Sequence, residues 1–174
     1  MYVNYPILSF FIFQTSSRKR KMEIIKKFKL GKLKLDYTKL LIEKAILARK
    51  NAYVPYSKFK VGAAIITNNN KIYGGFNIEC SSYSPTNCAE RTALFRAVYD
   101  GHRNFKAIAV VGGKESESCP LFSYTPPCGV CRQMLREFCH PLYFKIILAK
   151  SVDDFKIFTL DELFPLSFGP ENLK

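Results

Sequence analysis

Three cysteines and one glutamate have the residue types and the spacing that a metal site with hydrolytic chemistry needs. Glu90 lies two residues after Cys88, and further along the chain Pro127 precedes the pair Cys128 and Cys131. Thiolates suit zinc, and a structural zinc site takes four protein ligands, whereas a catalytic site keeps one position open for water. Three converging thiols beside a carboxylate therefore favour a hydrolytic zinc site over a redox pair or core cysteines.

Glu90 is the predicted proton carrier of this site. Hydrolysis requires a group that takes a proton from the attacking water and returns protons to the substrate and the leaving group, and one carboxylate beside the metal can perform each transfer. The alternative is a surface glutamate in the first turn of a helix, where an acid stabilises the helix end by about 0.3–1 kcal/mol. The neighbouring Cys88 favours the catalytic interpretation.

Two arginines follow the metal motifs directly. Three thiolates around Zn²⁺ leave a net charge of −1, which opposes ionisation of a bound water, and positive groups around the ligands offset it. We expect Arg91 to donate hydrogen bonds to the cysteine sulfurs, and Arg132 to do likewise. The alternative for each is an exposed helix arginine.

The elements that position these residues follow from the hydrophobic periodicity. Apolar residues recur at helical spacing from Tyr37 to Ala48, and apolar runs of strand length follow. The expected strands cover 61–67, 72–77, 107–111, 142–149 and 155–159, and the further expected helices cover 88–99 and 129–138. Both metal motifs thus lie at helix starts, where unpaired N–H groups favour thiolate over thiol.

The order of these elements predicts the fold class. Strands separated by a helix suit right-handed parallel crossovers. Only residues 150–154 separate the last two strands, too few for a crossover, so that pair should be antiparallel. We therefore expect an α/β fold, a three-layer α/β/α sandwich with a mixed, mostly five-stranded sheet and helices on both faces.

The charge is distributed unevenly along the chain. The 174 residues carry a net charge of +13, and residues 1–34 hold nine of the basic residues but only one acid, Glu23. We expect a basic, solvated extension over 1–34 and one folded catalytic domain over 35–174. The moderate charge of that domain argues against a specific nucleic-acid partner. No apolar run approaches the roughly 20 residues of a membrane span, so we expect no membrane partner.

The six cysteines would permit a disulfide framework in a secreted protein. The apolar run at 5–13 precedes the basic run at 18–21, however, which is the reverse of a secretory signal. We therefore expect reduced cysteines and a cytoplasmic protein. A targeting role for residues 1–34 stays open, as does initiation at Met22.

Several motifs in the same order resemble the cytidine deaminase family, specifically its small three-cysteine class that acts on free nucleosides. The resemblance covers the chain from about Leu40 to Leu173 and includes the cytidine deaminase-like fold. The motifs are Pro55–Ala64, Gly75–Glu79, Cys88–Arg91, Pro127–Gln133 and Leu166–Glu171.

The resemblance implies roles for residues outside the metal motifs. Phe59 would lie against the pyrimidine, and Asn77 and Glu79 would bind the ribose hydroxyls. An aromatic face suits a base, and an amide with a carboxylate can satisfy a hydroxyl as donor and acceptor. The resemblance further implies one zinc per subunit and a homotetramer whose active sites borrow residues across subunit contacts. The other implied substrate contacts are Ala89, Tyr83 and Phe168.

The implied reaction is hydrolytic deamination of cytidine and deoxycytidine to uridine and deoxyuridine, with release of ammonia, in pyrimidine salvage. Zinc-bound hydroxide would attack C4, with Glu90 carrying the protons. Two alternatives remain: a deaminase of a related aminopyrimidine nucleoside, such as a nucleoside antibiotic, or of nucleic acid, and a non-catalytic structural zinc protein. The last needs a fourth ligand, for which the chain offers Cys80, Cys119, Cys139, His102 and His140.

The chain departs from the family pattern at three places. Cys80 stands where the family usually has asparagine, Lys60 where it usually has proline, and the loop before Pro127 is longer and includes Cys119. None of these changes touches the metal motifs. We expect their effects in the loops around the ribose.

Overall fold

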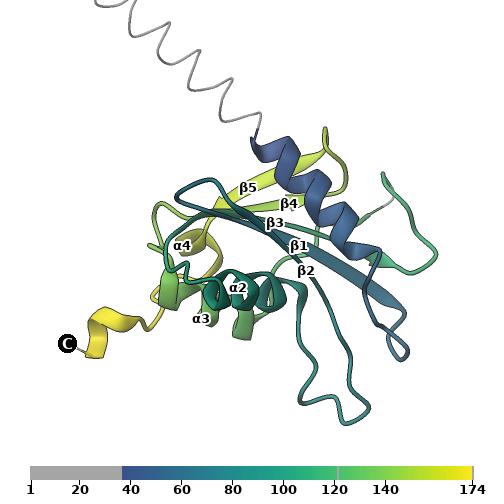
Figure 1. Cartoon of the computed structure of the whole chain (residues 1–174), viewed down its shortest axis with the longest axis horizontal. Coiled ribbons are helices and arrows are strands. Elements are labelled where there is room, and N and C mark those ends of the chain that lie inside the picture. The colour runs from purple at the N-terminus through teal and green to yellow at the C-terminus, as the bar shows by residue number, and fades with distance from the viewer. Residues whose placement is uncertain (1–36, 121, 174) are drawn as a thin grey trace, which may run out of the picture. The chain divides into compact units, whose positions relative to one another are not determined.

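The computed structural model describes residues 37–120 and 122–173, and its centre is a five-stranded sheet with the strand order β2-β1-β3-β4-β5 (Figure 1). The extension expected over residues 1–34 lies outside the described residues, so its boundary stays a prediction. None of the described helices is long and apolar enough to cross a membrane. The strands are β1 (Phe59–Thr67), β2 (Ile72–Phe76), β3 (Phe105–Lys114), β4 (Lys145–Ala149) and β5 (Phe155–Thr159).

The strand directions confirm the expected mixed sheet. β1 pairs antiparallel with both β2 and β3, so β2 and β3 run parallel to each other and α2 (Ala89–Tyr99) connects them. β3 pairs parallel with β4, and α3 (Gly129–Phe138) lies between these two strands in the chain. The short connection from β4 to β5 gives an antiparallel pair, as its length requires.

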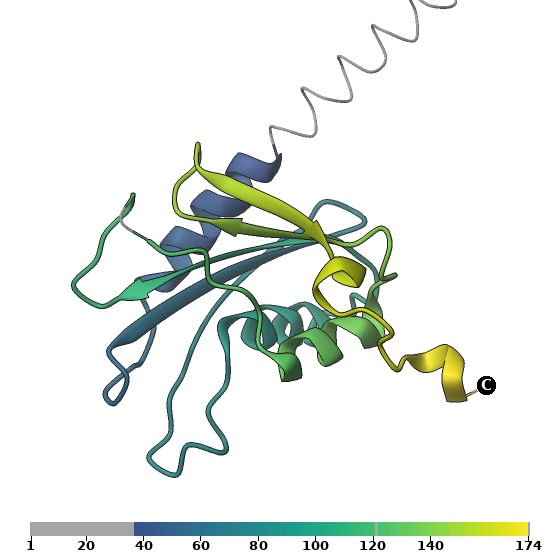
Figure 2. The ribbon, with the colours of Figure 1, turned by 180° about the vertical axis from the view of Figure 1, so that it is seen from behind.

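Helices cover both faces of the sheet, as Figures 1 and 2 show: the helix over residues 37–49 lies on one face, and α2 and α3 lie on the other. Two glycines allow this close packing. A Cβ on Gly62 would lie 2.1 Å from the backbone oxygen of Ala45, and one on Gly75 would lie 2.3 Å from the backbone nitrogen of Ala93. Gly75 pairs with Ala63, the neighbour of Gly62, so the two glycines point to opposite faces. The three-layer expectation is therefore confirmed.

The main core lies between the sheet and the pair α2 and α3. Burial of each large aliphatic side chain contributes about 1.5–3 kcal/mol, so this layer fixes the two helices firmly on the sheet. Its fully buried members include Ile65, Leu94, Ile108, Leu135, Ile146 and Leu160.

The element boundaries differ from the expectation at several places, and the largest differences are at β3, β4 and the C-terminal end. β3 continues beyond Val111 to Lys114, because the first residues of β1 pair with it, Phe59 opposite Lys114. β4 begins at Lys145 instead of Leu142, since a turn precedes it, and α4 (Leu160–Leu163) and a 3₁₀ helix (Pro170–Leu173) were not predicted. α4 is a single turn that begins with a Thr159–Glu162 capping box.

Candidate active site

The three predicted ligand cysteines converge at the starts of two helices. Cys88 is the N-cap of α2 and Cys128 is the N-cap of α3, while Cys131 lies fully buried in the first turn of α3. Neither N-cap side chain accepts a capping hydrogen bond from its own helix. The positive ends of both helix dipoles therefore stabilise negative charge at this place.

The spacing of the sulfurs fits a tetrahedral metal site. All three Sγ atoms lie within 4.8 Å of one another, and Cys88 Sγ is 3.8 Å from Cys128 Sγ. With Zn–S bonds of about 2.3 Å, two sulfurs on a tetrahedral zinc lie about 3.8 Å apart. The observed separation therefore matches two ligands of one zinc ion.

Over residues 37–120 and 122–173, the sulfur cluster contains no fourth protein ligand. Cys88, Cys128 and Cys131 form the group of potential ligands found there. Three ligands leave one tetrahedral position open, which is the arrangement of a catalytic site rather than a structural one. The fourth-ligand candidates of the structural alternative lie outside the group, namely Cys80, Cys119, Cys139, His102 and His140.

The ligand thiols differ strongly in acidity. The pKa of Cys88 is lowered to about 5, first because Cys131 hydrogen-bonds to its sulfur and then because Arg91 lies beside it. The pKa of Cys131 is raised far above its usual range by the same hydrogen bond and by burial. The two sulfurs therefore compete for one proton, and a divalent cation that binds both as thiolates removes this competition.

Glu90 occupies the second position of α2 and is only 4% exposed. Burial is the main reason that its pKa is raised to about 7, and the negative charge of Cys88 acts in the same direction. A carboxyl group whose pKa lies near neutrality both accepts and donates protons readily at that pH. The surface alternative for Glu90 is thus wrong, because the side chain is buried.

The two arginines contact different partners. Arg91 Nη2 donates to the backbone oxygen of Thr86 at 2.9 Å and lies 4.0 Å from Cys88 Sγ, so it is placed beside a ligand sulfur as expected. Arg132 donates instead to the backbone oxygens of Pro127, at 2.7 Å, and of Leu163. These bonds tie the loop before the second metal motif, and the end of α4, to α3.

A short backbone bridge places the end of β2 beside the first metal motif. Ile78 and Asn87 exchange two backbone hydrogen bonds of 2.9 and 3.0 Å. Thr92 strengthens the connection, since its Oγ1 donates to the Phe76 oxygen at 3.0 Å. Asn77 and Glu79 flank one side of this bridge and Cys88 follows the other, so the predicted ribose residues lie next to a metal ligand. Thr92 was not among the predicted site residues, because the only indication in the sequence is its position, four residues after Cys88.

Asn77 and Phe59 are joined by hydrogen bonds across the sheet edge. Asn77 Oδ1 accepts from the Val61 N–H at 2.8 Å, and its Nδ2 donates to the Phe59 oxygen at 2.9 Å. These bonds hold the start of β1, where Phe59 is half-buried. Asn77 therefore keeps one N–H donor and one oxygen lone pair for other partners, which is sufficient to hydrogen-bond a hydroxyl group.

Glu79 is held by the loop before β1. Its Oε2 accepts the backbone N–H groups of Tyr56 and Ser57, each at 3.1 Å. Burial acts to raise the pKa of Glu79, but hydrogen bonds from Ser57 and Tyr56 outweigh it and lower the pKa. The carboxylate is therefore charged at neutral pH, and these backbone bonds engage only one of its two oxygens.

The remaining predicted substrate residues divide into one buried and two exposed side chains. Ala89 is fully buried as the first residue of α2. Tyr83 is 69% exposed, with its ring centroid 5.8 Å from that of Tyr56, and Phe168 is 56% exposed. Both exposed aromatic rings are available for contacts outside their own chain.

Two of the three departures, Cys80 and Cys119, lie in loops, and the third, Lys60, is the second residue of β1. Lys60 forms a 3.1 Å ion pair with Glu115 in the longer loop, and Cys119 Sγ lies 3.6 Å from the Lys150 oxygen of the β4–β5 turn. The backbone N–H of Cys80 donates to Thr86 Oγ1 at 3.1 Å. Each of these residues thus makes local contacts, and none of them belongs to the sulfur cluster.

Comparisons with known proteins match this arrangement. The family model for the cytidine and deoxycytidylate deaminase zinc-binding region matches residues 36–144. A cytidine deaminase of Sporosarcina psychrophila is 47% identical over 142 residues, 80% of this chain and 96% of the relative. One of Halalkalibacterium halodurans is 45% identical over 134 residues, 77% of this chain and 96% of the relative. The crystal structure of a cytidine deaminase from Burkholderia pseudomallei has a TM-score of 0.66 at 44% identity, covering 74% of this chain and 97% of that one.

Proposed function

The chain belongs to the cytidine and deoxycytidylate deaminase family of zinc proteins, and from this membership we propose that it hydrolyses the 4-amino group of cytidine, and of deoxycytidine, to release ammonia. The observation that carries the proposal is the set of three sulfurs within 4.8 Å of one another beside the buried Glu90, without a fourth protein ligand in the described group. The products of this reaction would be uridine and deoxyuridine, and we propose on that basis a role in pyrimidine salvage.

The reaction divides between the metal and the residues of the chain. Cys88, Cys128 and Cys131 would hold a zinc ion, which would supply the Lewis acidity that activates water at neutral pH. Glu90 takes one proton from the attacking water and passes it to N3 of the ring, next to C4. It then takes the second proton from the hydroxyl group formed on C4 and passes it to the departing amino group, which leaves as ammonia. The Glu90 pKa of about 7 suits these transfers in both directions. Arg91 lies beside Cys88 and offsets the negative charge of the thiolates.

The nucleoside is bound by residues around the edge of β1 and β2. Phe59 packs against the pyrimidine, and the backbone N–H of Ala89 lies at the helix start that faces it. Asn77 and Glu79 bind the ribose hydroxyls through the hydrogen-bonding groups that their contacts with β1 and its preceding loop leave available.

The direct test is turnover followed by the ultraviolet change of the base, with purified zinc-loaded protein and either cytidine or deoxycytidine. Turnover of both is expected. Absence of turnover on both substrates, with one zinc per chain measured in the same sample, would contradict the proposal and favour a different aminopyrimidine nucleoside.

Replacing Glu79 by glutamine should raise the KM for cytidine by roughly 10- to 100-fold, because a hydrogen bond to a charged acceptor contributes about 1.5–3 kcal/mol. Glutamine retains an oxygen for the Tyr56 and Ser57 N–H groups, so the loop should keep its shape. The loss should be much smaller for 2′,3′-dideoxycytidine, which lacks both hydroxyls. Steady-state kinetics on the two nucleosides measure this difference. Glu115→Gln is the control, and an equal loss on both nucleosides would contradict ribose binding by Glu79.

We further propose a homotetramer with shared active sites in the cytoplasm. The exposure of Tyr83 and Phe168 supports the sharing, since rings this exposed within one chain are available to the site of a neighbour. All six cysteines are free, including the three of the metal site, and a reducing compartment keeps thiols in this state.

Subunit mixing tests the shared site. Phe168→Ala chains should have low activity and Glu90→Ala chains none, but a hybrid of the two contains sites with Glu90 from one chain and Phe168 from the other. Co-expression with two affinity tags and purification of the hybrid should therefore recover activity above the average of the parents. A hybrid with only that average activity would show that Phe168 does not act across subunits.

A further inference from the structure

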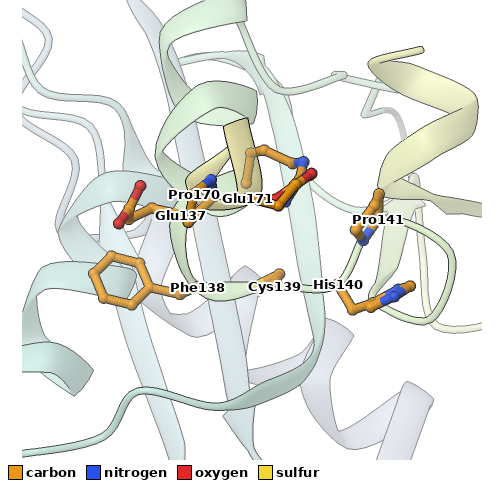
Figure 3. A pocket seen from close by; sticks show the side chains of 8 residues that line it. Glu137, Phe138, Cys139, His140, Pro141, Pro170 and Glu171 are labelled. Carbon is orange, nitrogen blue, oxygen red and sulfur yellow. The ribbon is translucent and has the colours of Figure 1, made fainter. Parts of the chain in front are cut away.

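The C-terminal segment that carries Phe168 is held by polar contacts with α3 rather than by burial of its own apolar side chains. We call residues 165–173 the C-terminal strap; the preceding residue, Phe164, packs against the core. Leu166 is completely exposed and Leu173 is 78% exposed, so these side chains contribute little burial to hold the strap. A cavity of about 520 Å³ also separates part of the strap from the end of α3, with Pro170 and Glu171 on one side and Phe138 to Pro141 on the other (Figure 3).

Arg136 is the centre of the contacts that hold the strap. Its side chain is only 8% exposed, its Nε donates to Ser167 Oγ at 3.0 Å, and its Nη2 forms an ion pair with Glu171. Gly169 lies directly against the guanidinium: a Cβ at this position would be 2.4 Å from Cζ and from Nη2. Arg136 therefore contacts the strap on both sides of Phe168.

A second residue of α3 fixes the backbone of Phe168 itself. Gln133 Nε2 donates to the Phe168 oxygen at 3.1 Å. Gln133 and Arg136 are three positions apart, so they lie on the same face of the helix. Within the strap, the Gly169 N–H donates to Asn172 Oδ1 at 2.8 Å. The backbone at Ser167–Gly169 is thus held from three directions, while the Phe168 ring between these contacts stays 56% exposed.

The desolvation free energy of the buried Arg136 indicates that this residue does more than attach the strap to α3. Burying a guanidinium costs desolvation free energy that an ion pair with the 60% exposed Glu171 only partly offsets. An apolar side chain at position 136 could pack against the same strap without that cost. The planar guanidinium, however, fixes direction as well as distance, because its donors point along set lines to Ser167 and Glu171.

We propose that Arg136 is a positioning residue, which holds the C-terminal strap so that the Phe168 ring is presented to the base-binding site of a neighbouring subunit. The inference rests on the proposed role of Phe168. α3 begins with the metal ligands Cys128 and Cys131, so one rigid helix sets both the metal of its own site and the aromatic ring that it lends.

The test is a double-mutant cycle on kcat/KM for cytidine. Arg136→Met keeps the length of the side chain and removes the donors, and it should lower kcat/KM roughly 10- to 100-fold, the effect of a misplaced substrate contact. Adding Phe168→Ala to this variant should lower the activity no further than Phe168→Ala alone. Gly169→Ala, whose Cβ displaces the guanidinium, should give a smaller loss in the same direction. Glu137→Gln, on the next residue of α3, is the control and should match the wild type.

Subunit mixing separates positioning from damage to the site on the same chain. Glu90→Ala chains should restore activity to Arg136→Met chains in a hybrid, because they supply a correctly held Phe168 to an intact metal site. Multiplicative losses in the cycle, or a hybrid without recovery while the Phe168→Ala hybrid recovers, would overturn the inference. Wild-type activity of Phe168→Ala would instead remove the proposed role of Phe168 itself. If Arg136→Met fails to fold, Gly169→Ala serves in its place. A normal kcat/KM in Gly169→Ala, or multiplicative losses when it is combined with Phe168→Ala, would equally overturn the inference.

Discussion

Glu90→Gln should retain zinc and lower kcat/KM for cytidine by a factor of at least about 10²–10⁴, the usual contribution of general acid–base catalysis. Glutamine has nearly the same shape as glutamate, so it should fit the buried position, where only 4% of the residue is exposed. It can donate and accept hydrogen bonds but cannot carry a proton between the water, N3 and the leaving amine. The metal should remain, because Glu90 is outside the group of sulfur ligands.

The measurement pairs zinc content per chain with single-turnover kinetics, so that loss of metal and loss of proton transfer are distinguished. Glu137→Gln is the matched control, since this glutamate lies on the exposed surface of α3. A Glu90→Gln enzyme with near-normal turnover would remove Glu90 from the mechanism. A variant without zinc would show instead that the buried carboxylate maintains the metal site.

The sheet could be predicted from the sequence because each strand has a local signal. The apolar run before Thr67 and the helical spacing around Leu94 depend on neighbours in the chain. The end of β3, in contrast, depends on residues distant in the chain. Gly112–Lys114 form part of the strand because Phe59–Val61 pair with them, and no local sequence pattern indicates that pairing. The same reason explains why α4 was missed, since a single turn with a capping box has too few residues for a periodicity.

The candidate site shows the same division between local and distant contacts. The convergence of Cys88 and Cys128 was predictable, because both stand before helices that a parallel crossover brings to one edge of the sheet. The partners of Arg132 were not, since Leu163 lies 31 residues away in a turn that was itself unpredicted. The Arg136 contacts with the C-terminal strap belong to this second kind.

Close packing between the sheet and α2 places Glu90, on the helix, beside the predicted ribose residues that follow β2. Gly75 on β2 contacts the backbone at Ala89 and Ala93, and Thr92 donates to the strand that carries Gly75. The position of Glu90 therefore depends on how closely this helix approaches the sheet. A methyl group inserted at the contact should separate them, with consequences for both stability and catalysis.

Gly75→Ala should accordingly destabilise the protein by about 1–3 kcal/mol, the usual cost of overpacking. Its Cβ would lie 2.3 Å from the Ala93 nitrogen and 2.5 Å from the Ala89 oxygen, and neither backbone atom can rotate away. The forced shift of α2 should also lower kcat/KM by roughly 10- to 100-fold, because the shift moves Glu90 relative to the metal ligands of α3. Urea denaturation of zinc-loaded protein and steady-state kinetics measure the two effects.

The adjacent Gly74→Ala is the matched control, since its Cβ would face the opposite helix at an ordinary 3.4 Å from Ala48 Cβ. At a compatible backbone position, glycine to alanine stabilises by about 0.4–1 kcal/mol through the unfolded chain. The two neighbouring substitutions should therefore differ in sign for stability, and only Gly75→Ala should impair turnover. Equal behaviour of the pair would mean that α2 can move away from the sheet without disturbing Glu90. The carboxylate would then be positioned mainly by the metal ligands beside it, rather than by the contact of its helix with β2.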